Sequence, residues 1–249
     1  MEYFLKIMLL FYFLNNNNKC KGEKMSVVVA VKSSNSVWMA CDSQLTYGGL
    51  KTNLIGNKNN YKIFRSKQNK HLLIGMVGNW TDHSILKSIY DIIPTDELDE
   101  VDEIGFKDKI NIKKELSNTI MLEKNIYKFD YDFVVNHIRP RIFSILDEND
   151  RLIYCDGAKN MQSELLIAYK NQLFQIGCGG AVTEIDEYIA IGAGSHFAYG
   201  SLYATRYIDM LIEEKCCSAV KAACEHSVNV NYPLVLTNTM WRRNKFNIV

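Results

Sequence analysis

The order of strand-like and helix-like segments limits the fold of this chain more than any other feature of its sequence. Runs of β-branched and other apolar residues, typical of strands, occupy residues 26–32, 36–41, 61–65, 71–77, 163–169, 172–176, 188–191 and 234–237. Helical spacing of apolar residues occupies residues 81–93, 131–146, 195–214 and 217–228. This order of strands, two helices, strands, two helices and a strand predicts an α+β fold, with stacked antiparallel sheets between helical layers.

Two features interrupt the pattern. Pro140 lies inside the 131–146 segment. We expect it to end or kink that helix, because proline lacks the backbone N–H and clashes with the preceding turn. Residues 95–130 are charged and irregular, and we interpret them as an insertion with one short helix near residues 111–122.

Composition excludes several classes of function. An apolar fraction of 47% and a charged fraction of 23% over 249 residues are typical of a globular protein with a proper core. A net charge of +1 without a basic block argues against a nucleic-acid-binding surface. The five histidines have no zinc-ligand spacing, so no metal is expected. Seven cysteines, an odd number without a C-x-x-C pair, indicate reduced thiols and a cytoplasmic location.

The first 25 residues differ in character from the rest, and their origin stays open between a leader, a pro-segment and an untranslated upstream extension. Residues 3–14 are apolar but too short to span a bilayer, so no membrane is expected. Lys6 and this apolar run resemble a secretory signal, although no small-x-small cleavage site precedes Ser26. Residues 21–25 (KGEKM) back-translate to a sequence that permits a bacterial ribosome-binding site before ATG. The favoured hypothesis is therefore that translation starts at Met25.

Five motifs in a fixed order resemble the proteasome β-subunit family, and within it the bacterial HslV-type peptidases. They are SVVVAVK at 26–32, ACDSQLT at 40–46, KI at 62–63, GMVG at 75–78 and AIGAGS at 190–195. The resemblance implies the N-terminal-nucleophile (Ntn) hydrolase fold in one domain at residues 26–249. That fold is a four-layer αββα sandwich of two antiparallel sheets between helical layers. A loop at residues 48–60, rich in Asn and Gly, absorbs a few residues more than the family has.

The resemblance implies an active site built around an N-terminal serine. Ser26 occupies the position of the family's nucleophile, normally threonine, whose own α-amine (pKa ~8) acts as the base. Lys62 would lower the pKa values of the hydroxyl and the amine, and Asp42 would hold Lys62 in place. Gly78 would supply an oxyanion-hole N–H, where a side chain would block the substrate. This chemistry requires a chain that begins at Ser26, which removal of Met25 would produce.

The resemblance also implies binding and supporting residues. Met76 and Thr46 would line the pocket for the substrate. The family's supporting serine is replaced here by Ala193, for which Ser195 is an imperfect substitute. Glu225 stands where the family has a supporting aspartate.

Each catalytic candidate also has a simpler interpretation. Ser26 alone would be the first residue of a strand, and Asp42 a turn residue whose side chain bonds its own backbone. Lys62 would be a charge at a strand edge, with Lys58 as a competing candidate, and Gly78 would end a strand. The five motifs together favour the functional interpretation.

The predicted function is that of an HslV-type peptidase, which hydrolyses peptide bonds of a polypeptide with Ser26. The resemblance implies self-assembly into a hexameric or heptameric ring, stacked as a double ring, with an ATPase unfoldase as a further candidate partner. It implies no cofactor and no nucleic acid. Two alternatives stay open: a catalytically inactive structural β-type subunit, favoured by Ala193, and a small-molecule Ntn amidase, favoured by the insertion at 95–130.

Overall fold

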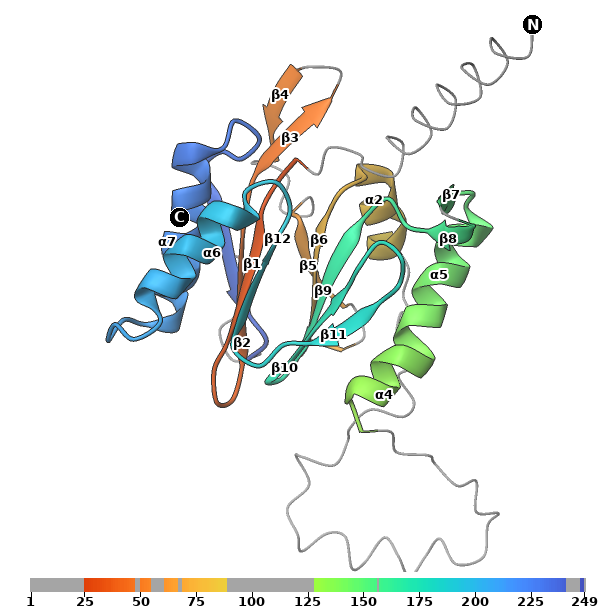
Figure 1. Ribbon diagram of the computed structural model, residues 1–249, viewed down its shortest axis with the longest axis horizontal. Coiled ribbons are helices and arrows are strands. Elements are labelled where there is room, and N and C mark those ends of the chain that lie inside the picture. Colours follow the sequence, from red (N-terminus) through yellow and green to blue (C-terminus); the bar gives the residue numbers. More distant parts are fainter. Residues whose placement is uncertain are drawn as a thin grey trace, which may run out of the picture.

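The computed structural model describes residues 25–47, 50–54, 61–66, 69–88, 128–155, 157–240 and 247–248. Within these ranges the fold is α+β and contains two five-stranded sheets (Figure 1). The first sheet has the order β12 (Tyr188–Ile191), β1 (Val28–Lys32), β2 (Val37–Asp42), β13 (Leu234–Asn238) and β14 (Asn247–Ile248). The second has the order β11 (Val182–Glu184), β10 (Gln172–Ile176), β9 (Glu164–Tyr169), β6 (Leu72–Val77) and β5 (Ile63–Arg65). All the pairings in both sheets are antiparallel, as predicted.

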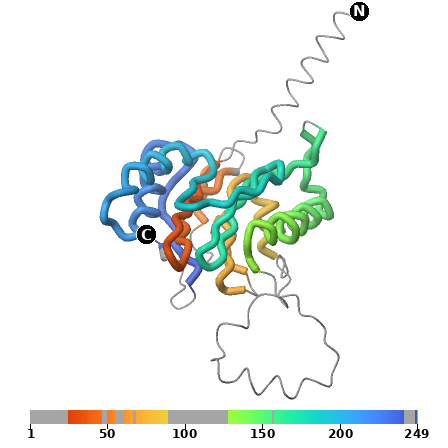
Figure 2. The backbone as a smooth tube through the Cα atoms, turned by 60° about the horizontal axis from the view of Figure 1, so that its bottom comes forward, coloured from red at the N-terminus to blue at the C-terminus, as the bar shows by residue number. Residues whose placement is uncertain are grey.

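Helices and two small hairpins complete the described chain. The helical segments are α2 (Trp80–Ser88), α4 (Tyr131–Phe133), the π-helical η3 (Val134–Ile138), α5 (Arg139–Glu148), α6 (Ser195–Thr205) and α7 (Ile212–His226). The hairpins are β3 (Gln44–Tyr47) with β4 (Leu50–Asn53), and β7 (Ile153–Cys155) with β8 (Ala158–Asn160). Figure 2 shows α6 and α7, in blue, on the opposite side of the strands from α4 and α5, in green.

The valine-rich run at residues 27–31 is apolar at every position because both of its faces are buried. Val27 and Val29 belong to an apolar cluster with α6 and α7, whereas Val28 and Ala30 belong to a cluster with the second sheet. Successive side chains of a strand point to opposite faces, which explains this division. A third cluster joins the second sheet to α2 and α5 through residues such as Leu86. Each sheet therefore packs against the other sheet and against helices.

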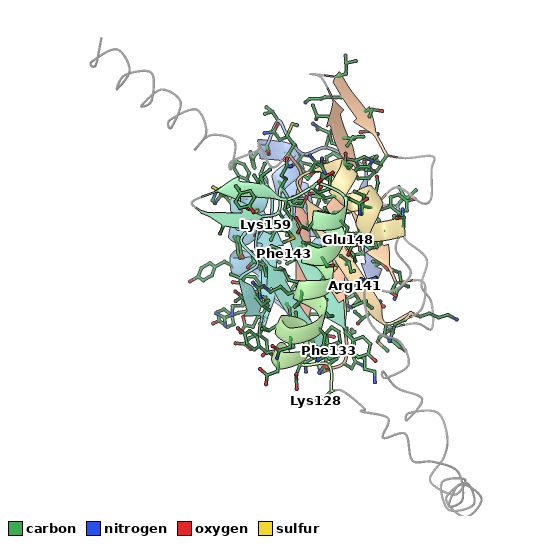
Figure 3. The ribbon with its side chains drawn as sticks, turned by 90° about the vertical axis from the view of Figure 1, so that its right-hand side faces the viewer. Lys128, Phe133, Arg141, Phe143, Glu148 and Lys159 are labelled. Carbon is green, nitrogen blue, oxygen red and sulfur yellow. The ribbon has the colours of Figure 1, made fainter. Side chains whose placement is uncertain are left out.

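The helix that was expected to end or kink at Pro140 does not end there. Helical structure continues from Tyr131 to Glu148, and Pro140 lies in the first turn of α5, directly after the π-helical segment η3. Figure 3 shows this run with Phe133 near one end and Glu148 near the other. At the junction the N–H of Arg139 donates to the carbonyl of Val134, five residues back. The wider turn before the proline provides a helix start, where a missing N–H is tolerated.

The helix predicted at 195–214 was wrong at its end. It stops at Thr205, and α7 begins at Ile212 rather than at residue 217. The backbone N–H of Leu211 donates to Glu214 Oε2 at 3.3 Å, which caps the start of α7. The apolar spacing runs across residues 206–211, so it does not reveal the turn between the two helices.

Other expectations are corrected or lie outside the described residues. Part of the loop predicted at 48–60 is strand β4. Residues 1–24 and 89–93, the short helix at 111–122, most of the insertion at 95–130 and Lys58 lie outside the described residues.

Five cysteines are free thiols, namely Cys41, Cys178, Cys216, Cys217 and Cys224. Cys155 is disulfide-bonded, contrary to the expectation that the cysteines are reduced. In the described ranges no helix combines the length and the apolar character that crossing a membrane requires.

Candidate active site

A pocket of about 380 Å³ gathers most of the residues predicted for the active site. Ser26, Thr46, Lys62, Met76 and Gly78 all line it. They come from the segment just before β1, from β3, from the residue before β5, and from β6 and the residue after it. Packing of the two sheets against each other brings these segments to one place.

The backbone of Ser26 is held by the glycines of the AIGAGS motif. The N–H of Gly194 donates to the carbonyl of Ser26 at 3.2 Å. Gly192 has a φ of +95°, and a Cβ there would lie 2.4 Å from the same carbonyl oxygen. Ser26 itself is buried, with a φ of 135°. Met25, the preceding residue, also lines the pocket.

Asp42 and Lys62 form a buried ion pair beneath the pocket. Lys62 Nζ lies 2.6 Å from Asp42 Oδ1, and the two residues are only 3% and 1% exposed. Asp42 Oδ1 also accepts the N–H of Val27 at 2.9 Å, and its Oδ2 accepts the N–H of Gln44 at 3.1 Å. The carboxylate thus connects the lysine to the residue that follows Ser26. The pairing with Asp42 agrees with the role expected of Lys62, whereas the competing candidate Lys58 lies outside the described residues.

Gly78 has a backbone reason to be glycine. Its φ is +115°, and a Cβ would lie 2.5 Å from the carbonyl oxygen of Gln162 and 2.8 Å from Cα of Ser163. Substrate access and the end of a strand are the two reasons that the sequence suggests for this glycine, and the backbone adds a third. Positive φ and the neighbouring backbone exclude a side chain before any substrate binds.

Replacing Gly78 by alanine should therefore destabilise the protein more than an ordinary glycine substitution. Gly157 is a matched control, because its φ is +79° and a Cβ there would meet nothing within 4 Å. Gly157→Ala should cost about 1–2 kcal/mol from backbone strain alone. We expect Gly78→Ala to cost a further ~1–3 kcal/mol from the clash. Urea unfolding of both variants would measure the difference, and equal losses would contradict a steric role for Gln162 and Ser163.

The two predicted supporting residues do not reach the pocket. Ser195 is the half-buried first residue of α6, and it is not among the residues that line the pocket. Glu225 is exposed near the end of α7 and accepts the hydroxyl of Tyr232 at 2.9 Å. That hydrogen bond raises the pKa of Tyr232 to about 12. Ala193 separates the two glycines that hold Ser26 and brings no hydroxyl.

His83 is a pocket residue that the sequence reasoning missed. It lies on α2, is 3% exposed, and lines the pocket together with Trp80. The two rings stack with centroids 4.3 Å apart, and Phe64 contacts the imidazole edge-on at 5.2 Å. Nε2 of His83 lies 2.7 Å from the carbonyl oxygen of Tyr61. Because a carbonyl only accepts hydrogen bonds, this assigns the proton of the neutral ring to Nε2.

The buried His83 should make stability depend on pH. Burial, with a smaller contribution from Lys87, lowers the pKa of His83 from 6.5 to about 4. Between these values the unfolded chain binds a proton that the folded protein does not, so the free energy of unfolding should fall as the pH drops from 6.5 to 4. The full loss is about 3 kcal/mol. Urea unfolding at pH 7 and 4.5 would measure it, with His83→Gln as the non-titrating control. An equal pH dependence in both proteins would contradict the assignment.

No cluster of His, Cys, Asp and Glu side chains suited to a metal ion occurs in the part of the chain that the structure describes. The pocket instead combines a serine hydroxyl, a lysine paired with a buried carboxylate, and a glycine turn. Such a set can support nucleophilic attack on a carbonyl, provided that a base lies beside the hydroxyl.

Comparisons with known proteins identify the fold. No protein-family model matches the sequence, and no curated protein matches it significantly. Among solved structures, BPH of Thiobacillus denitrificans in complex with epoxomicin is similar with a TM-score of 0.56 and 18% identity, covering 85% of this chain and 97% of that one. Eukaryotic HslV from Trypanosoma brucei gives a TM-score of 0.52 and 17% identity, covering 85% and 98%. Anbu, an ancestral beta-subunit from Yersinia bercovieri, gives 0.52 and 13%, covering 85% and 80%.

These neighbours confirm the resemblance at the level of the fold. They are proteasome-like proteins, and the agreement extends over most of the chain on both sides of each comparison. The chain therefore shares the fold of these BPH, HslV and Anbu structures.

Proposed function

We propose that this chain, which has the fold of the HslV and Anbu proteins, is a peptidase that cleaves peptide bonds with Ser26 as its N-terminal nucleophile. The observation that carries the proposal is the meeting of Ser26 and Lys62 in one pocket, with Lys62 held by the buried Asp42. The packing of each sheet between helices and the other sheet supports the four-layer αββα arrangement expected for such an enzyme.

The proposed reaction uses residues of this chain alone. Ser26 Oγ attacks the carbonyl carbon of the peptide bond while the α-amine of the same residue takes the hydroxyl proton. The positive charge of Lys62 favours the developing alkoxide, and the N–H of Gly78 stabilises the oxyanion. The amine returns the proton to the leaving nitrogen, and water then hydrolyses the ester at Ser26. These steps require a free amine, so the working protein must begin at Ser26, without Met25.

Self-association into a ring of six or seven copies, stacked as a double ring, is part of the proposal. Large apolar side chains stand exposed on α6 and on the turn that follows it. Tyr203 is 70% exposed, Tyr207 85% and Leu211 60%. Such a patch favours burial against another protein surface, and a second copy of this chain is the occupant that the fold suggests. An ATPase unfoldase would then deliver polypeptide to the chamber, and a cytoplasmic location is proposed with it.

A catalytically silent subunit is the second candidate. Ala193 lacks the hydroxyl of the family's supporting serine, and Ser195 and Glu225 stand away from the pocket. If the proton shuttle needs those groups, the pocket would keep its shape without turnover. A small-molecule amidase is the third candidate, for which the inserted residues 95–130 are the only support.

One experiment separates the three. N-terminal sequencing would establish the first residue of the native protein, and epoxomicin, which BPH binds, would serve as the covalent probe. Labelling at Ser26 together with hydrolysis of casein supports the peptidase. A chain that starts at Ser26 and resists labelling favours the silent subunit. Labelling without hydrolysis of any peptide favours the amidase.

A further inference from the structure

Helix α2 carries two adjacent polar side chains that are buried beside the pocket. Asp82 is completely buried, and His83 is 3% exposed. Burying a polar group costs free energy unless it finds hydrogen-bond partners. Nε2 of His83 and both carboxylate oxygens of Asp82 have such partners, whereas Nδ1 of His83 has none among the described residues. The partners lie in different segments of the chain.

His83 reaches the segment that carries Lys62. Its Nε2 donates to the carbonyl of Tyr61 at 2.7 Å, one residue before Lys62. The carbonyl of Lys62 in turn accepts the N–H of Met76 at 2.9 Å. Lys62 is therefore tied to β6 on one side and, through its neighbour, to α2 on the other. The stacked ring of Trp80 fixes the orientation of the imidazole.

Asp82 reaches the turn that contains Gly78. Its Oδ2 accepts the hydroxyl of Ser163 at 2.8 Å, and that hydroxyl accepts the N–H of Asn79 at 3.1 Å. The other oxygen, Oδ1, accepts Nε of Arg151 at 2.8 Å. These hydrogen bonds lead from Asp82 through Ser163 to the peptide group between Gly78 and Asn79. They hold that glycine in its left-handed conformation, against the backbone of Ser163.

We propose that Asp82 and His83 form one positioning unit, which fixes Lys62 and the Gly78 turn relative to each other from the first turns of α2. The meaning of this unit for catalysis rests on the proposed function of Ser26, but its geometry does not. Lys62 and the N–H of Gly78 would act on charge that develops in the transition state. Their displacement should therefore lower kcat and leave KM nearly unchanged.

Three variants of the full mature assembly test the unit. His83→Leu removes the donor to Tyr61, whereas His83→Gln offers an amide N–H in its place. Ser163→Ala interrupts the path from Asp82 to Asn79. We expect His83→Leu and Ser163→Ala each to lower kcat about 10- to 100-fold, because small displacements of catalytic groups have effects of that size. His83→Gln should recover most of what His83→Leu loses. The rate is expressed per folded site, which removes any effect of lost folding.

Hydrogen–deuterium exchange gives a second readout that needs no turnover. Exchange should rise at residues 61–65 in His83→Leu, and at residues 76–81 in Ser163→Ala, with each variant affecting its own segment. Equal effects of His83→Leu and His83→Gln on exchange would overturn the proposal, and so would unchanged exchange in both segments. If the unsubstituted protein has no hydrolytic activity, the proposed function fails, while the exchange data still decide whether the unit positions Lys62 and Gly78.

Discussion

Replacing Ser26 by alanine, in a chain that begins at residue 26, should abolish peptide hydrolysis and labelling by epoxomicin. We expect kcat to fall by on the order of 10⁴-fold or more, as when other hydrolases lose their nucleophile. Alanine removes the only atom of residue 26 that can form the ester, while the backbone contacts with Gly192 and Gly194 persist. Initial rates with a fluorogenic peptide, measured beside intact mass after labelling, would give the result.

Two further chains make this prediction specific. Ser26→Thr retains the hydroxyl and should remain active and labelled. A chain in which Met25 stays attached has the same pocket but an amide instead of an amine at Ser26, so it lacks the base and should lose hydrolysis as well. Unchanged hydrolysis by Ser26→Ala would show that another residue is the nucleophile. Full activity with Met25 attached would show that the α-amine is not the base.

The strands were predictable because the burial of a strand is visible in the apolar character of its own residues. Every position from Val27 to Val31 is buried, so the run is continuously apolar and cannot be mistaken for an exposed segment. Helix ends were less predictable. The residues between Thr205 and Ile212 continue the helical spacing, and the bond from Leu211 to Glu214 that starts α7 depends on the fold.

The residues of the candidate site also differ in whether the sequence predicts them. Ser26, Asp42 and Gly78 sit in motifs that are contiguous in sequence, and the structure brings Ser26 and Gly78 into one pocket above Asp42. His83 and the neighbouring Asp82 lie outside the five motifs. They are buried because each meets a partner far along the chain: Tyr61 lies 22 residues from His83, and Ser163 lies 81 residues from Asp82. A pattern within one helix contains no information about such partners.

The Asp42–Lys62 pair should show strong coupling in a double-mutant cycle. Lys62→Met leaves a buried carboxylate that keeps only backbone donors, and Asp42→Asn leaves a buried ammonium without its counter-charge. Removing one partner of a buried pair costs about 3–5 kcal/mol, because the other charge stays buried and unpaired. The double variant, Asp42→Asn with Lys62→Met, contains neither charge. We therefore expect it to be more stable than either single variant. Urea unfolding at a fixed protomer concentration would measure all four proteins, and additive losses would show that the two charges do not interact.

Activity should not follow stability in this cycle. The double variant should recover much of the folding free energy and none of the hydrolysis, since methionine brings no positive charge to Ser26. Buried ion pairs are often replaceable by apolar residues without loss of stability, so stability alone does not explain a pair that is 3% and 1% exposed beside the pocket. Recovery of folding without recovery of epoxomicin labelling would indicate that the pair is required for the chemistry at Ser26. Hydrolysis by the double variant at the rate of the unsubstituted protein would remove Lys62 from the mechanism.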